Sequence, residues 1–111
     1  MVRRCLFLAV SAVLIAGHLV AHAQSQQPIT HCSNWLKGGQ VRTALEHWLI
    51  GYMSGMSTVW EMQGLKPANP GGRIKKNADL FLYVDAHCRL NTGDDVSVAG
   101  FKLFRELASQ K

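Results

Sequence analysis

Residues 40–62 read QVRTALEHWLIGYMSGMSTVWEM, and this stretch carries the strongest helical pattern in the chain. Its apolar side chains recur at intervals of three and four, as they do on one face of an α-helix. Gly64 follows closely and favours an end to the helix near Met62. The pattern predicts one long helix whose inward face is formed by Val41, Leu45, Trp48, Leu49, Tyr52, Met56 and Val59.

Two glycines, Gly51 and Gly55, interrupt this long segment. A glycine inside a helix costs about 1 kcal/mol relative to alanine, and residues four apart lie on the same face. We expect a neighbouring helix of the same domain to cross closely at these positions. The alternative is a groove for a partner, next to the adaptable side chains of Met53, Met56 and Met62.

Two shorter helices are predicted nearer the C-terminus. The first begins near Asn77 or Asp79, either of which suits a helix cap, and the second begins at Asp94 or Asp95. Apolar residues follow each start at helical spacing. The predicted inward faces are Leu80, Phe81, Val84 and Cys88 in the first helix, with Asp85 and Arg89 outside, and Val96, Phe101, Leu103, Phe104 and Leu107 in the second.

A short helical turn is predicted over residues 32–36, and the glycines at 38 and 39 end it. No segment has a convincing strand pattern. The predicted fold class is therefore all-α, with three to four helices in one small domain that is stapled by one disulfide.

Residues 65–72, LKPANPGG, are predicted to form a loop without regular structure, because two prolines and two glycines interrupt it. A plain connector is the simpler interpretation, and a binding loop is the alternative. Basic residues at and after this loop are candidates for contact with another protein. The predicted partner-binding residues are Gly51, Gly55, Lys66, Arg73, Lys75 and Lys76.

The first 23 residues have the order of a secretory signal peptide. Arg3 and Arg4 precede an apolar run, and a small-x-small cleavage site, Ala21-His22-Ala23, closes it. Residues 1–23 are therefore predicted to be removed, which leaves residues 24–111 as one soluble periplasmic domain without stable membrane insertion. An uncleaved anchor is the alternative, although the run is short of the roughly 20 residues of a membrane span.

The cysteines indicate one disulfide. The chain has three cysteines, of which Cys5 leaves with the signal peptide. Cys32 and Cys88 then remain in an oxidising compartment, where paired cysteines commonly staple small domains. In the chain-entropy model a bridge of this span contributes about 4 kcal/mol. Two free thiols are the alternative.

The charge of the chain gives no sign of a nucleic-acid partner. The net charge of +5 falls to about +3 when Arg3 and Arg4 are removed. The basic residues are scattered, so no nucleic-acid partner is predicted. Residues 24–30 are polar and are expected to form a disordered lead-in.

No constellation in the sequence predicts chemistry. His31, His47 and His87 are too few to form a metal site, although a disulfide would bring His31 and His87 close together. Ser54 sits within a helical pattern and lacks the Gly-x-Ser-x-Gly spacing of a nucleophile elbow. The cysteines form no Cys-x-x-Cys motif. We therefore predict a protein that is not an enzyme and that uses neither metal nor cofactor.

Several short motifs span most of residues 24–111. These are Cys32-x-x-Trp35-Leu36, Gly51-Tyr52-x-Ser54-Gly55, Cys88-Arg89-x-Asn91 and Leu103-x-x-Glu106-Leu107. The pattern resembles a group of small exported proteobacterial helical proteins with CxxWL, GYxSG and YCxxNP motifs. It is similar, more distantly, to the HdeA/HdeB acid-stress chaperones and to the periplasmic immunity proteins that block type VI amidase effectors. Here Thr92 stands where that group has proline.

The resemblance implies export, a helical disulfide-bonded fold and a function in binding other proteins. An immunity or inhibitor protein presents a fixed surface to one effector. An HdeA-like chaperone is the alternative, and it would capture clients when acid loosens its fold. A structural accessory of an envelope complex is a third class. The sequence names no partner and no oligomeric state.

Overall fold

The computed structural model describes residues 28–111, so the predicted signal peptide at residues 1–23 lies outside the described part. The described residues form four α-helices and one 3-10 helix, with no β-strand beyond an isolated bridge between His31 and Asp95. The all-α class is therefore confirmed. The elements are α1 (Cys32–Lys37), α2 (Gly39–Met62), η1 (Pro70–Arg73), α3 (Asn77–Leu90) and α4 (Val96–Ser109).

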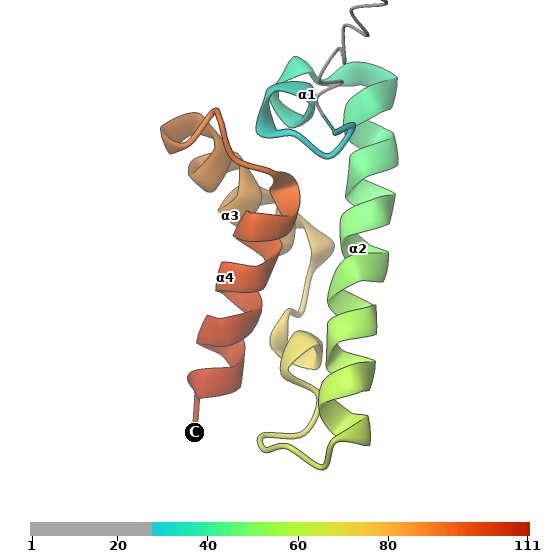
Figure 1. Ribbon diagram of the computed structural model, residues 1–111, viewed down its shortest axis with the longest axis vertical. Coiled ribbons are helices and arrows are strands. Elements are labelled where there is room, and N and C mark those ends of the chain that lie inside the picture. Colours follow the sequence, from blue (N-terminus) through green and yellow to red (C-terminus); the bar gives the residue numbers. More distant parts are fainter. Residues whose placement is uncertain (1–27) are drawn as a thin grey trace, which may run out of the picture.

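Helix α4 lies between the other two long helices. Helices α2 and α4 run side by side in the same direction, and α3 contacts α4 from the other side (Figure 1). Helix α1 closes one end by contacting both α2 and α3, and η1 contacts α2 and α4 further along. The core that these elements enclose consists of Cys32, Trp35, Leu45, Leu49, Met53, Leu80, Val84, Cys88, Val96, Ala99, Phe104 and Leu107.

The long helix α2 has nearly the predicted bounds, but its buried face is shifted. The predicted inward residues Val41, Trp48 and Val59 are 38%, 39% and 55% exposed. Apolar residues extend beyond one face of α2, and α4 and η1 cover only part of that circumference. The prediction was therefore wrong for one flank of the helix, and the buried residues are Leu45, Leu49, Met53 and Ser57.

The predicted tight crossing over Gly51 and Gly55 is also wrong. A Cβ atom added at either glycine would meet no other atom within 4 Å. The close approach occurs instead at Gly100 of α4. A Cβ atom there would lie 3.1 Å from side-chain carbons of Leu49 and of Tyr52. The close contact between α2 and α4 is therefore at Gly100, and not over Gly51 and Gly55.

The helix starts agree with the sequence only in part. Asp95 caps α4 as predicted, and its side chain accepts a hydrogen bond from the Ser97 amide at 2.9 Å. The cap position of α3 is Lys76, which makes no side-chain cap bond, so the predicted caps Asn77 and Asp79 are wrong. Asp79 instead lies in the first turn of α3, where a negative charge suits the helix dipole.

The inward face of α4 is also shifted from the predicted one. Phe101 is 49% exposed, whereas Ala99 and Gly100 are buried. Small residues allow α4 to approach α2 closely, and Phe101 is consequently left at the edge of the contact.

The connection between α2 and α3 contains a short helix where none was predicted. The backbone of Asn69 is in the left-handed conformation, with φ 46°. Its side chain accepts a hydrogen bond from the Gly72 amide and caps η1. The hydroxyl of buried Ser57 accepts a second bond from the Gly71 amide at 3.0 Å. Side-chain acceptors thus stabilise a turn that composition alone had assigned to irregular loop.

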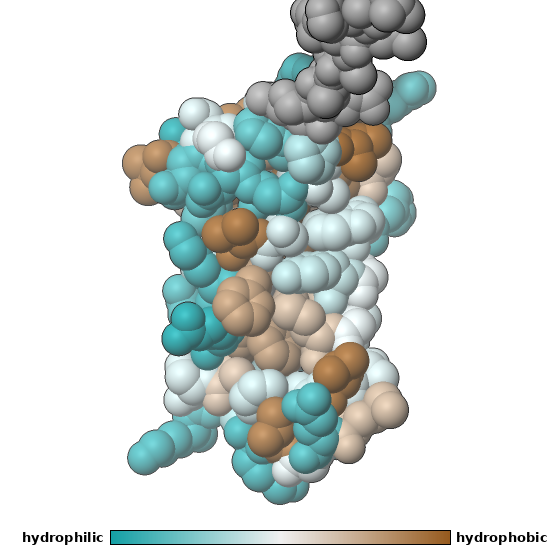
Figure 2. Space-filling model, viewed as in Figure 1, coloured by the Kyte–Doolittle hydropathy of each residue, from teal (hydrophilic) through white to brown (hydrophobic). Residues whose placement is uncertain are grey.

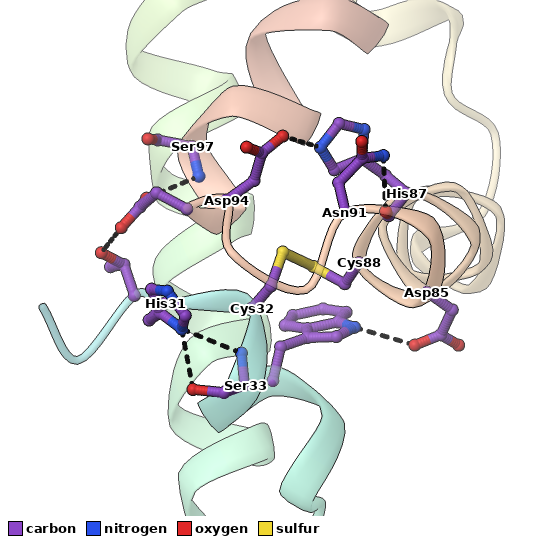
Figure 3. Close-up of a disulfide and its surroundings, with 12 residues drawn as sticks. His31, Cys32, Ser33, Asp85, His87, Cys88, Asn91, Asp94 and Ser97 are labelled. Atoms are coloured by element: carbon purple, nitrogen blue, oxygen red, sulfur yellow. Dashed lines mark hydrogen bonds and ion pairs between the residues drawn. A yellow bond between two sulfur atoms is a disulfide. The ribbon is translucent and has the colours of Figure 1, made fainter. Parts of the chain in front are cut away.

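The predicted disulfide joins Cys32, the first residue of α1, to Cys88 in the last turns of α3 (Figure 3). Their Cα atoms are 5.1 Å apart, an ordinary separation for a bridged pair.

The backbone just before this bridge is ordered against α4. The carbonyl of Thr30 accepts from the Val96 amide at 2.8 Å, so the expectation of disorder is wrong for residues 28–30. Residues 24–27 lie outside the described part.

Candidate functional site

The first candidate is a polar cluster around the buried ring of Trp35, which belongs to the same short helix as Cys32 of the disulfide. The indole N–H donates to Oδ1 of Asp85 at 2.8 Å, and Nη1 of Arg42 donates to the same oxygen at 2.7 Å. The Arg42 guanidinium lies 3.7 Å above the centre of the Trp35 ring. The sequence prediction that Asp85 faces outward is therefore wrong, because a buried indole N–H needs an acceptor.

Two carboxylates at this end have lowered pKa values. Burial alone would raise the pKa of Asp85, but hydrogen bonds from Arg42 and Trp35 and the positive charges of Arg42 and Arg89 outweigh it. Burial likewise opposes the shift at Asp95, where hydrogen bonds from Thr30 and Ser97 lower the pKa. Both ionised carboxylates therefore stabilise the fold. That contribution is lost as the pH falls below the ordinary value of 3.8.

The histidines that flank the disulfide do not converge. Nδ1 of His31 lies 2.7 Å from the Ser33 hydroxyl, whereas Nε2 of His87 lies 2.8 Å from Oδ2 of Asp94. Within residues 28–111 no three metal-ligating side chains come together, and no buried side-chain N or O atom lacks a hydrogen-bond partner. This end of the described domain is internally satisfied and is built for stability.

The second candidate is an apolar surface that we call the α2–α4 face. Figure 2 shows brown and pale side chains along the seam between these two helices. Val59 and Phe101 are 55% and 49% exposed, on α2 and α4 respectively. The face comprises Trp48, Tyr52, Met56, Val59 and Trp60 of α2 and Val98, Phe101, Phe104, Arg105 and Ala108 of α4.

A groove of about 460 Å³ lies within this face, and aromatic side chains shape it. The indole N–H of Trp60 donates to the carbonyl of Pro67 at 2.9 Å. The same ring packs edge-on against Phe104, with the centroids 5.7 Å apart. The groove is therefore held open by side chains whose positions are fixed within the domain. Its lining residues are Met56, Trp60, Phe101, Phe104, Arg105, Ala108 and Ser109.

A stacked aromatic pair extends the face beyond the groove. The rings of Trp48 and Tyr52 are nearly parallel, with centroids 5.1 Å apart and an interplanar angle of 12°. Burial and the nearby charge of Asp95 raise the pKa of Tyr52, so its hydroxyl stays neutral. The pair offers a flat apolar surface that is already ordered.

The border of the face on α4 is positively charged. The Arg105 guanidinium lies 6.0 Å from the centre of the Phe101 ring. Among residues 28–111, neither Arg105 nor Lys102 forms an ion pair. The neighbouring Glu106 accepts a hydrogen bond from the Tyr83 hydroxyl at 2.8 Å. Burial, and to a smaller extent this bond and the charge of Glu106, raise the pKa of Tyr83 to about 12. Glu106 lines one hollow with both cations but forms no ion pair with either, so the two cations can pair with an external carboxylate.

The predicted partner-binding residues fall on separate surfaces. Gly55 lies on the flank of α2 between Trp48 and Val59, at helical spacing, and Gly51 lies further around the helix. Both glycines are exposed and border the α2–α4 face. Lys66 lies in the loop after α2, exposed to solvent.

The remaining predicted residues belong to the connection before α3. Nη1 of Arg73 donates to the Gln110 side chain at 3.3 Å, and Nζ of Lys75 donates to the Gly72 carbonyl at 3.4 Å. Arg73 and Lys75 line a hollow of about 220 Å³ between α3 and α4, and Lys76 is exposed at the start of α3. The structure does not bring this basic group together with the two glycines.

A third hollow, of about 260 Å³, lies between α2, η1 and the start of α3. Its polar groups come from Ser54, Asn69 and Asn77, and none of its lining side chains is charged. It offers neither an acid–base pair nor a set of metal ligands, so the α2–α4 face is the stronger candidate.

Sequence reasoning offered a partner groove beside Gly51 and Gly55 only as an alternative, because it assigned most side chains of this face to the core. The available signal was the width of the apolar pattern on α2, which exceeds the stripe that one neighbouring layer covers. A pattern that is too wide for one contact indicates a second contact.

The chain matches no protein-family model, no curated protein and no solved structure. The likeness to small exported helical proteins therefore stays a prediction. None of the helices within residues 28–111 has the length and apolar character that crossing a bilayer requires.

Proposed function

We propose that this protein is an exported, non-enzymatic protein-binding module that holds its partner on the α2–α4 face. One observation carries the proposal, namely the continuous run of exposed aromatic and aliphatic side chains around a groove that the domain itself keeps open. Large exposed apolar patches are uncommon on monomeric proteins and commonly mark interaction sites. Trp, Tyr and Arg are also the residues that most often dominate binding energy in interfaces.

The chemistry of the face supports binding over catalysis. Arg105 is its only charged member, and the Tyr52 phenol has a raised pKa. Such a surface has neither a nucleophile beside a base nor two carboxylates around one bond. It does have apolar depth and an ordered wall, which are what a partner side chain needs.

The rigidity of the face favours an immunity-type or inhibitor-type protein. Trp60 is held by the Pro67 carbonyl and by Phe104, and Trp48 is stacked on Tyr52. A preformed surface loses little conformational entropy on binding and therefore binds tightly for its area. The disulfide and the predicted signal peptide support delivery to an oxidising, periplasmic space.

The acid-chaperone alternative has one observation in its favour. Asp85 and Asp95 connect α1 and the preceding residues to the rest of the domain, and both carboxylates have lowered pKa values. Acid removes both contributions and adds positive charge to a domain that is already at about +3 once Arg3 and Arg4 are removed. Loosening would then expose more apolar surface for unfolded clients.

A capture experiment with matched variants tests the proposal. The oxidised protein is used as bait in periplasmic extract at pH 7 and at pH 3, alongside Phe101→Asp and Leu82→Asp. Leu82 is 64% exposed on α3 and lies off the proposed face, so its variant controls for the added charge. We expect one stoichiometric partner at pH 7, which Phe101→Asp loses and Leu82→Asp keeps.

The other outcomes are equally informative. Capture that both variants retain would place the binding site elsewhere and would overturn the assignment to the α2–α4 face. Many clients at pH 3 and none at pH 7 would favour the chaperone over the immunity-type protein.

A further inference from the structure

We infer that the occupant of the α2–α4 groove is an acidic amphipathic helix of the partner protein. The inference rests on the proposed function and adds the chemistry of the partner. The groove runs between two helices that lie side by side in the same direction (Figure 1). An apolar groove between two helices can accept the apolar side of a third helix, whose anchors recur every three or four residues.

The length of the face sets the length of the bound helix. On α2 the face extends from Trp48 to Trp60, which corresponds to roughly 18 Å at the helical rise of 1.5 Å per residue. A partner helix of roughly three turns spans this distance. Its apolar anchors would lie on the Trp48–Tyr52 stack at one end and in the groove beside Trp60 and Phe104 at the other.

The charge of the border selects an acidic helix. Arg105 lines the groove, and Lys102 lies one turn earlier on the same helix. Neither cation has an ion-pair partner within residues 28–111. A carboxylate at the edge of the bound helix would meet an unpaired guanidinium next to apolar surface, where water screens it less than on an open surface. A basic helix would be repelled by the same two residues.

A second copy of this chain is a poorer occupant. The nearest carboxylates to the α2–α4 face already have partners within the domain, since Glu106 accepts from Tyr83 and Asp95 accepts from Thr30 and Ser97. A symmetric pair of faces would therefore offer Arg105 and Lys102 only carboxylates that are already hydrogen-bonded. Self-association would therefore bring four cations near one apolar interface and add no free carboxylate for them. The observed charge pattern favours a different protein that carries the acid.

A display selection tests the partner's charge directly. A library of three-turn helical peptides, randomised on one face, is selected on the oxidised protein and on Lys102→Glu/Arg105→Glu. The matched control is Lys75→Glu/Lys76→Glu, which makes the same charge change at the basic group before α3. We expect the wild type and the control to enrich peptides that combine apolar anchors with Asp or Glu. The groove variant should instead enrich Lys or Arg.

Affinities of one selected peptide and of its Glu→Lys counterpart provide the quantitative test. We expect the acidic peptide to bind the wild type at least about tenfold more tightly, a difference that calorimetry resolves. Lys102→Glu/Arg105→Glu should abolish or reverse that preference, and Lys75→Glu/Lys76→Glu should retain it. Circular dichroism confirms that each variant is folded.

The outcomes separate this inference from the proposed function. One outcome is that the selected helices no longer bind Phe101→Asp but show no preference for Asp or Glu. That outcome would overturn the inference and leave the assignment of the binding face intact. An absence of helices that depend on Phe101 would overturn the inference as well. In that case the capture experiment decides the proposed function. If a partner captured from extract still requires Phe101, the proposed function stands. If neither the selection nor the capture depends on Phe101, the proposed function is overturned as well. A dimer in sedimentation that Phe101→Asp dissociates would identify a second copy as the occupant and overturn the acidic helix.

Discussion

The disulfide end and the α2–α4 face differ in how far their aromatic side chains are buried. At the disulfide end, Trp35 is fully buried, its N–H is bonded to Asp85, and Arg42 covers its ring. On the α2–α4 face, Trp48 and Phe101 are 39% and 49% exposed, and no element of the described domain covers their outer sides. One tryptophan environment is complete within residues 28–111, and the other is open on one side.

The difference indicates which region maintains the fold and which remains for a partner. A satisfied polar cluster stabilises the domain because removing any one member leaves a buried group without its partner. An open apolar face adds little to folding, since much of its area stays in contact with water. Variants of the first region should therefore change stability, and variants of the second should change binding.

The largest expected effect is the loss of the disulfide. Cys32→Ser should lower the free energy of unfolding by about 4 kcal/mol, because the unfolded chain regains the freedom of a long loop. Chemical denaturation measures this change. Reductant should destabilise the wild type by a similar amount and should leave Cys32→Ser unaffected. An unchanged thermal midpoint in the variant would show that the bridge does not hold this end.

The next effect is the contribution of Asp85, which depends on pH. At pH 7, Asp85→Asn should lower the free energy of unfolding by about 1–2 kcal/mol, because charge-assisted hydrogen bonds to Arg42 and Trp35 are weakened. The folded pKa of Asp85 is below 3.8, so the difference from wild type should shrink as the pH falls through and below that value.

Urea denaturation at pH 7 and at pH 3 tests this pH dependence. Glu61→Gln serves as the control, because Glu61 makes no ion pair within residues 28–111. A gap between wild type and Asp85→Asn that stays constant from pH 7 to pH 3 would contradict the assigned role of the carboxylate.

Two glycine substitutions of the same kind should have opposite signs. Gly100→Ala places a Cβ atom 3.1 Å from side-chain carbons of Leu49 and Tyr52. Because Leu49 is fully buried, we expect the overpacking cost of about 1–3 kcal/mol to exceed the helix-propensity gain of about 1 kcal/mol and to lower stability. Gly55→Ala meets nothing within 4 Å and should raise stability by about 0.5–1 kcal/mol through helix propensity. Thermal denaturation of the two variants gives both signs. Destabilisation by Gly55→Ala would mean that the outer surface of α2 already has a neighbour.

The smallest effect on stability is expected on the α2–α4 face itself. Val59→Ala should change the free energy of unfolding by no more than about 0.5 kcal/mol, since this side chain is 55% exposed. Leu49→Ala, at a fully buried core position outside this face, should cost about 3 kcal/mol in the same assay. Similar losses in the two variants would make the α2–α4 face part of the core and would remove the contrast between the regions.

Local pattern was enough for some elements and not for others. The long helix, the turn at residues 32–37 and the Asp95 cap follow from spacing and cap chemistry, which act within a few residues. The bridge was predicted from the two cysteines that remain after the predicted removal of the signal peptide. The position of Asp85 depends on Arg42 and Trp35, which belong to other helices, so spacing within α3 did not reveal it. The turn of η1 depends on Ser57 of α2 and on the left-handed backbone of Asn69, which spacing did not reveal either.

The sequence by itself determined that the protein is helical, where its long helix lies and which cysteines pair, because periodicity, glycine placement and cysteine count are local or numerical properties. Only the tertiary structure decided which flank of α2 is buried. Helix α4 packs at Gly100, so Leu49 is covered and Trp48 is not. Both residues belong to the same apolar pattern, and the direction from which a neighbour approaches separates core from binding surface.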